Sequence, residues 1–157
     1  MLRIQIVRTS VISLPLVFMA ASVLALAQVG TNNTVLNANL ASANELQTVP
    51  HIDAPIVQAI ISGRPYLAAT AFDATLRATS LSDQQRAEVR VKLFVPINLN
   101  TASEEEMMLV PGVGSRMAHE FEESRPYVNM AQFEREIGKY VDDDEVARLA
   151  RYVYVGQ

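Results

Sequence analysis

Apolar residues recur at helical spacing in short stretches along this chain. Two pairs of them lie four positions apart and therefore fall on one helix face each: Phe72 with Leu76, and Phe133 with Ile137. Segments rich in β-forming residues are short, and residues 91–95 and 152–155 fit either frayed helix ends or segments that close a folded unit. The pattern predicts an all-α protein built from short helices.

Helix starts and ends carry recognisable signals. Capping boxes are predicted at Ser42–Glu45 and at Ser103–Glu106, each followed by inward-facing apolar residues. A second helix then follows in each case and ends at Arg64 or at Arg125, because each arginine precedes a proline. A later acidic cluster, 142–145, suits the positive end of a helix dipole, so we interpret it as a solvated helix start and not as a metal site.

The same signals occur twice. Placing Pro50 on Pro111 gives an offset of 61 positions, at which ten further identities align without a gap. The pairs are Asn37/Asn98, Asn39/Asn100, Ala41/Ala102, Ser42/Ser103, Glu45/Glu106, Val49/Val110, Arg64/Arg125, Pro65/Pro126, Tyr66/Tyr127 and Phe72/Phe133. We therefore predict two tandem units of about four short helices, at 37–95 and 96–157, preceded by a flexible tether at 28–36.

The N-terminus resembles a targeting segment. Two arginines precede an apolar run from Val11, which ends in Ala25-Leu26-Ala27. Positive charge, an apolar stretch and a small-residue site together predict a signal peptide at 1–27, and thus a periplasmic or secreted protein. An uncleaved membrane anchor is the alternative, but the run is shorter than a typical spanning helix.

Composition limits the chemistry. The chain has no cysteine, which excludes a lipoprotein anchor and a disulfide framework. After residue 27 it carries 11 Lys and Arg against 17 Asp and Glu, a formal charge of −6, so any contact with a polyanion must be local. The two histidines, His51 and His119, are not at equivalent positions, and no nucleophile–base arrangement is visible. We expect no enzyme activity, cofactor, metal or small-molecule substrate.

One segment could hold an anion. Pro111-Gly112-Val113-Gly114-Ser115-Arg116 combines a two-glycine turn with a helix start, where backbone N–H groups and the helix dipole favour negative charge. The alternative is that the glycines only make the tight turn that the fold needs. In the first unit the positions equivalent to 112–116 are occupied by His51-Ile52-Asp53-Ala54-Pro55. There Asp53 repels a phosphate and Pro55 lacks an N–H.

Residues 98–103, 106–107 and 110–114 resemble the helix-hairpin-helix domain of the ComEA-type competence DNA receptors. That family is exported and binds double-stranded DNA without sequence preference during uptake. The resemblance is strong over 97–125 and weaker over 126–155. It implies tandem helix-hairpin-helix units and phosphate contacts at Gly112, Val113, Gly114, Ser115 and Arg116, with the backbone contributing at Val113 and Ser115.

An assembly module is the alternative function. The small extrinsic lumenal subunit of photosystem II is similar in its helix-hairpin-helix unit, including an Ala-Pro-Tyr stretch comparable to Arg64-Pro65-Tyr66, and is structural. On this hypothesis the partner is a protein in the exported compartment. Arg64 and Arg125 are predicted to be structural, pairing with a carboxylate or with last-turn carbonyls. Tyr66 and Tyr127 are predicted to pack between helices with their hydroxyls at the surface.

Overall fold

A computed structural model describes residues 28–29 and 34–156 of the 157-residue chain. The predicted signal peptide and residues 30–33 of the predicted tether lie outside the described residues. Within them, the chain forms eight short helices and five strands of two or three residues, which confirms the all-α class. None of these helices is long and apolar enough to cross a membrane.

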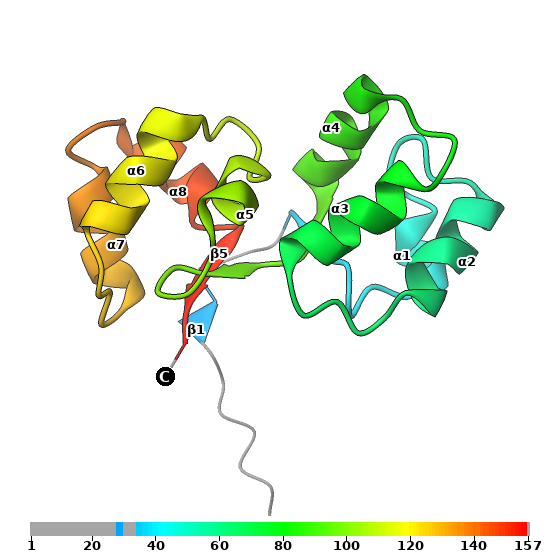
Figure 1. Ribbon diagram of the computed structural model, residues 1–157, viewed down its shortest axis with the longest axis horizontal. Helices are drawn as coiled ribbons and strands as arrows, with labels where there is room; N and C mark the ends of the chain where they lie inside the picture. Colours follow the sequence, from blue (N-terminus) through cyan, green and yellow to red (C-terminus); the bar gives the residue numbers. More distant parts are fainter. Residues whose placement is uncertain (1–27, 30–33, 157) are drawn as a thin grey trace, which may run out of the picture.

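The helices form two groups that lie side by side (Figure 1). We call residues 34–95 the N-terminal half; it contains β2 (Leu36–Asn37), α1 (Ala43–Leu46), α2 (Ala54–Ser62), α3 (Ala69–Arg77), α4 (Asp83–Lys92) and β3 (Leu93–Phe94). We call residues 96–156 the C-terminal half; it contains β4 (Ile97–Asn98), α5 (Glu104–Met108), α6 (Ser115–Glu123), α7 (Met130–Ile137), α8 (Asp143–Leu149) and β5 (Val153–Val155).

Short strands close each half. β2 pairs with β3 in parallel, and β4 pairs in the same way with β5. The first strand, β1 (Gln28–Val29), pairs antiparallel with β5, so both ends of the segment predicted as a tether, 28–29 and 36, lie in strands. Of the two interpretations of the β-rich segments, the structure supports closing strands, with residues 91–92 as the last residues of α4.

The residues that recur at the offset of 61 make the same hydrogen bonds twice. The Asn39 side chain donates to Tyr66 O at 2.8 Å and accepts from Tyr66 N at 2.7 Å, and Asn100 holds Tyr127 with the same two distances. Arg64 donates to the carbonyls of Ala38 and Ala41, both at 2.7 Å. Arg125 donates likewise to Leu99 and Ala102, both at 2.6 Å.

These contacts correct part of the predicted arginine role. Arg64 and Arg125 are structural, but their main partners are carbonyls of the loop before the first helix of each half, not last-turn carbonyls. A carboxylate partner is present only for Arg125, whose Nη1 lies 3.7 Å from Glu122 Oε1. Each arginine therefore fastens the end of a second helix to the loop that opens its half.

The tyrosine hydroxyls are buried, so the prediction of surface hydroxyls was wrong. Tyr66 Oη donates to Ile60 O at 2.8 Å, and Tyr127 Oη donates to Phe121 O at 3.0 Å. Burial raises the pKa of Tyr127 to about 12. The hydroxyls point inward because each one donates to a carbonyl six residues earlier, in the preceding helix.

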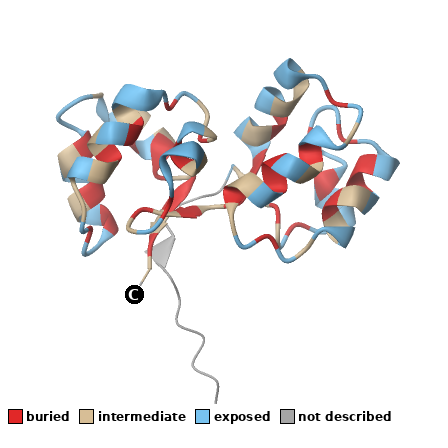
Figure 2. Cartoon of the chain, in the orientation of Figure 1, coloured by how far each residue is buried: buried red, intermediate tan, exposed pale blue. Residues whose placement is uncertain are grey.

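Specific contacts join the two halves beyond the general burial of apolar side chains along the inner faces of the helices (Figure 2). Tyr152 Oη donates to Val91 O at 3.0 Å, and the Tyr152 ring meets Phe94 edge-on with the centroids 5.4 Å apart. The Glu106 carboxylate accepts the N–H of Ser103 at 3.1 Å, in its own capping box, and that of Ala69, the first residue of α3, at 3.0 Å.

Candidate nucleic-acid interface

The Pro111–Gly114 hairpin turns between α5 and α6 within four residues. Gly112 has φ +81°, a backbone conformation that side-chain-bearing residues rarely adopt. The N–H of Val113 donates to Val110 O at 3.0 Å, and the Val113 side chain is buried. The predicted amide donor at Val113 is therefore used within the turn, where it fixes the hairpin against the core.

The start of α6 is open. Gly114 is the N-cap residue and supplies no side-chain hydrogen bond to the first turn. Apart from Gly114 itself and its two neighbours in the chain, no described atom lies within 4 Å of the position that a Cβ on Gly114 would occupy. Gly114, Ser115 and Arg116 are all exposed, and within the described part of the chain the amides of Ser115 and Arg116 have no hydrogen-bond partner. These N–H groups, at the positive end of the helix dipole, can receive an anion.

Arg116 is the cation nearest in sequence to this helix start. Its side chain is exposed, and no carboxylate in the described residues lies within ion-pair distance of it. It borders a hollow that is also lined by Gly114, Met117, Glu120 and Tyr140. A hydrogen bond with Glu120 raises the pKa of Tyr140. The Glu120 carboxylate therefore adds negative charge close to the predicted phosphate position.

Among the described residues, Arg148 of α8 is a further cation that lies beside the hairpin. Its Nη2 lies 2.7 Å from the position that a Cβ on Gly112 would take. Glu145 holds the guanidinium through two hydrogen bonds of 2.6 Å, and the Arg148 Cζ lies 6.0 Å from the centre of the Tyr152 ring. Sequence reasoning did not place Arg148 in the site, because only the packing of α8 on the hairpin brings the two together.

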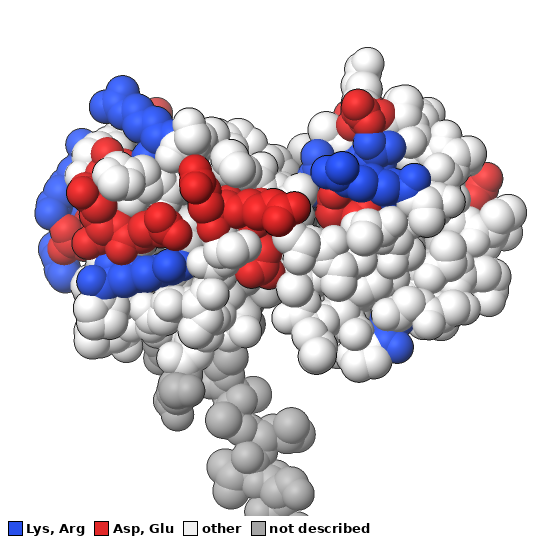
Figure 3. Space-filling view, viewed as in Figure 1, with Lys and Arg blue, Asp and Glu red and all other residues white. Residues whose placement is uncertain are grey.

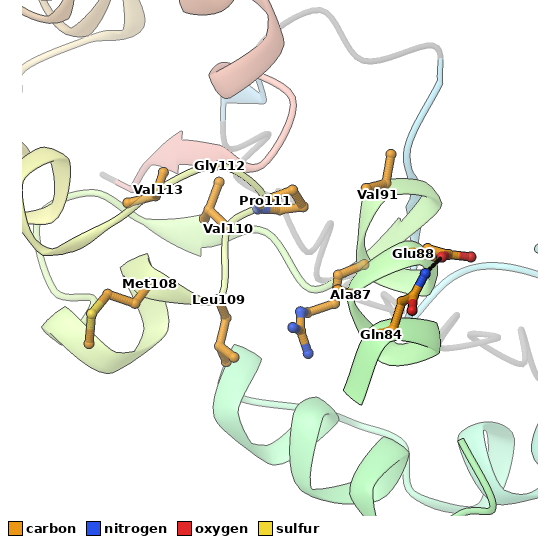
Figure 4. Close-up of a pocket in the computed structure, with 11 residues that line it drawn as sticks. Gln84, Ala87, Glu88, Val91, Met108, Leu109, Val110, Pro111, Gly112 and Val113 are labelled. Atoms are coloured by element: carbon orange, nitrogen blue, oxygen red, sulfur yellow. Dashed lines mark hydrogen bonds between the residues drawn. The ribbon is translucent and has the colours of Figure 1, made fainter. Parts of the chain in front are cut away.

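A pocket of about 350 Å³ separates the hairpin from α4 (Figure 4). Leu109, Val110 and Pro111 line it on one side, and Ala87 and Val91 lie among the residues on the α4 side. The Glu88 carboxylate, which accepts a hydrogen bond from Gln84, also lies on the α4 side. The lining is mostly apolar, and of its two charged residues Glu88 is acidic while Arg90 is already paired with Asp73, so the pocket does not suit a phosphate.

Comparison with known families assigns this region. A family model described as "Helix-hairpin-helix motif" matches residues 93–152. This part of the chain is a helix-hairpin-helix domain. No curated protein and no solved structure matches the chain. The helix-hairpin-helix motif suggests nucleic-acid binding in general.

The N-terminal half turns in the same way but presents a different surface. His51, at the position equivalent to Gly112, has φ +67°, and Ile52 N donates to Val49 O at 3.3 Å. Asp53 caps α2 by accepting from Ile56 N at 3.0 Å, and Pro55 lies in the first turn. A carboxylate thus occupies the place that is open in the helix-hairpin-helix domain, and it repels an approaching phosphate.

Charge is distributed unevenly between the halves. The N-terminal half contains five acidic and five basic residues, whereas the C-terminal half, which includes most of the helix-hairpin-helix domain, contains twelve and six. In Figure 3 acidic side chains gather over the C-terminal half, with basic ones toward its outer edge. Two arginines of the N-terminal half, Arg77 and Arg90, pair with the buried Asp73 at 2.6 Å each. The excess of negative charge therefore lies in the same half as the open start of α6.

Proposed function

We propose that this chain is a non-enzymatic protein that binds double-stranded DNA weakly and without sequence preference, through the start of α6. The observation that carries the proposal is the uncapped first turn of α6, where Gly114 leaves open space and Arg116 is exposed. Such a site contacts backbone phosphates and reads no base edges, so it gives no sequence preference. One hairpin offers only one or two phosphate contacts, which makes the binding weak.

The setting that we propose is export, in the manner of the ComEA-type receptors, with a role in DNA uptake. The residues at 98–103 and 110–114 support this resemblance, and the segment 1–27 supports export. We also propose that 37–95 is a second, degenerate unit of the same kind, since its Asn39, Arg64 and Tyr66 make the same hydrogen bonds as their counterparts. N-terminal sequencing of periplasmic material should begin at Gln28, whereas an intact Met1 would contradict cleavage.

A salt titration with short duplex DNA tests the binding. The purified protein should bind at low salt, and the logarithm of its binding constant should fall with the logarithm of salt concentration at a slope of about −1 to −2. Absence of binding at the lowest salt would refute the proposal. Arg116→Glu should abolish binding. Lys92→Glu is the matched control, because it makes the same charge change at an exposed residue at the end of α4.

Gly114→Asp is the sharper variant. The Cβ of an aspartate there has open space around it and, at φ −105°, the backbone is not strained, so the fold should persist. Its carboxylate would cap α6 as Asp53 caps α2 and would repel phosphate. We expect affinity for duplex DNA to fall about tenfold or more, as for the loss of one charge-assisted contact. Unchanged affinity in this variant would mean that α6 does not hold the phosphate.

A protein-interaction or assembly module is the second candidate, and exposed apolar residues favour it. Leu67 is 93% exposed and Leu40 is 79% exposed, although both are large apolar side chains in the N-terminal half. If this surface binds a protein partner in the exported compartment, Leu67→Glu should remove the partner from cross-linked complexes and leave DNA affinity unchanged. Loss of DNA affinity in Leu67→Glu would contradict the hypothesis that the protein partner and DNA bind to separate surfaces.

A further inference from the structure

We propose that Arg148 is a second phosphate-binding residue of the hairpin and that Glu145 restrains it. The proposal rests on the proposed DNA binding at α6 and adds a group from α8 that the hairpin sequence does not contain. It would make the site a two-sided one, with Arg116 on α6 and Arg148 beside the preceding turn.

The first support is the closeness of the guanidinium to the turn. Measured from the position of a Cβ on Gly112, Nη2, Cζ and Nη1 of Arg148 lie at 2.7, 3.4 and 3.8 Å. A side chain at position 112 would occupy the space that the guanidinium now fills. The φ of +81° is what favours glycine at this position, and the missing side chain also lets a cation lie against the backbone two residues before the α6 N-cap.

The second support is the way in which Arg148 is held. Its Nε and Nη2 donate to the two carboxylate oxygens of Glu145 at 2.6 Å each, with the ring of Tyr152 nearby. This pairing lowers the pKa of Glu145. The side chains of Arg148 and Glu145 are 30% and 35% exposed, so a phosphate can reach the guanidinium. An ion pair this exposed contributes little to stability, so exchanging Glu145 for a phosphate costs little.

The third support comes from the N-terminal half, where the fourth helix contacts the turn with the opposite charge. Glu88 of α4 contacts His51, the counterpart of Gly112, with 2.6 Å between Oε2 and Nε2. Both halves thus place a polar side chain of the fourth helix beside the turn, and its charge differs between them. A cation beside the turn is particular to the C-terminal half, where it is available for phosphate binding in addition to its pairing with Glu145.

Paired variants separate a phosphate-binding role from a purely structural one. Arg148→Gln should weaken duplex DNA binding about tenfold and reduce the magnitude of the salt slope by about 0.9, the loss of one phosphate contact. Glu145→Gln should strengthen binding about threefold or more, because it releases the guanidinium. In the double variant the gain from Glu145→Gln should disappear, since no guanidinium is left to release.

The matched control for charge is Asp144→Asn, which makes the same charge change at an exposed position of the same helix turn. It should strengthen binding less than Glu145→Gln does. A bracing role alone predicts the opposite result, in which Glu145→Gln weakens binding as Arg148→Gln does and the salt slope stays unchanged, and this would overturn the proposal. Thermal unfolding of each variant, with midpoints within a few degrees of wild type, excludes misfolding as the cause.

The two proposals fail in different ways. If wild-type protein shows no salt-dependent binding to DNA, the proposed function fails and the role of Arg148 fails with it. If wild type binds and Gly114→Asp does not, while Arg148→Gln binds as wild type does, then only the role of Arg148 is wrong. Arg148→Lys provides a further check, since it should keep the salt slope and lose part of the affinity.

Discussion

The two hairpins have similar backbone turns, but the helix that follows starts with a carboxylate cap in one and without a side-chain cap in the other. Each turns on a residue of positive φ, +67° at His51 and +81° at Gly112, and each closes with an N–H···O bond between equivalent residues. One then starts a helix with the carboxylate of Asp53, and the other starts it with the bare Gly114. The comparison teaches that the turn itself does not depend on the helix cap, so the cap can vary without loss of the fold.

What holds both halves in shape lies away from the hairpins. The same asparagine, arginine and tyrosine hydrogen bonds fasten the opening loop of each half to the end of its second helix. These bonds have similar lengths in the two halves, although the net charge of the halves differs by six units. The shared contacts explain the recurring residues, and the residues that differ at the hairpin are available for function.

The largest effect is expected from removing the shared arginines. Arg64→Ala and Arg125→Ala each delete two hydrogen bonds from a charged donor to backbone carbonyls and should each lower the free energy of unfolding by about 3 kcal/mol. Urea denaturation of the two variants measures this. A loss in one half that is more than about 2 kcal/mol larger than in the other would break the structural equivalence of the halves.

The turn residues should respond unequally to substitution. Gly112→Ala places a side chain at φ +81° and against Arg148, so it should destabilise the protein by about 1–2 kcal/mol. His51→Gly removes the same kind of backbone strain but loses the contact with Glu88, so its net effect should stay below about 1 kcal/mol. Chemical denaturation compares them, and a loss at His51→Gly as large as at Gly112→Ala would contradict this account.

Exchanging the caps should change stability less and in opposite directions. Gly114→Asp should stabilise the protein by a few tenths of a kcal/mol, and Asp53→Gly should destabilise it by about the same amount, because glycine is only slightly poorer than aspartate as an N-cap. Thermal unfolding resolves the sign. If Gly114→Asp proves markedly unstable, the loss of DNA affinity expected for it would have no simple interpretation.

The smallest effect concerns pH. Hydrogen bonds from His51 and Gln84 lower the pKa of Glu88 below its ordinary value of 4.5. A carboxyl group with a lowered folded-state pKa stabilises the protein above the unfolded-state pKa and loses that contribution as the pH falls through the folded-state value. Glu88→Gln should therefore reduce the loss of stability on acidification below about pH 4.5. Urea midpoints across this range test it, with an unaltered pH profile as the contrary result.

Sequence reasoning reached the elements of the fold but not the contacts between them. Helical spacing and capping boxes identify the helices around Phe72, Phe133, Ser42 and Ser103, because these signals are local. The partners of Arg64 lie 23 and 26 residues away in the chain, and periodicity does not say which loop crosses which helix end. The tyrosine hydroxyls were misplaced for a different reason, since the sequence pattern does not show whether a hydroxyl faces solvent or a carbonyl six residues earlier.

For the candidate site, the glycine turn and Arg116 follow from the sequence, whereas Arg148 does not. Gly112 and Gly114 indicate a sharp turn and a close approach, and the structure has both the positive φ and the open helix start. Val113 was assigned a backbone contact that the turn itself uses. The closeness of Arg148 depends on how α8 packs on the hairpin, which no motif in the sequence records.

Glu106 gives the molecule a mechanical property. A single carboxylate completes the starts of α3 and α5, which belong to different halves, because Ala68 has no side chain that can cap α3 itself. Separating the halves therefore exposes an amide at one helix end and loosens the side chain that closes the other. Opening of the interface and fraying of the helix before the hairpin are therefore coupled through one side chain, so a force that separates the two halves also acts on α5.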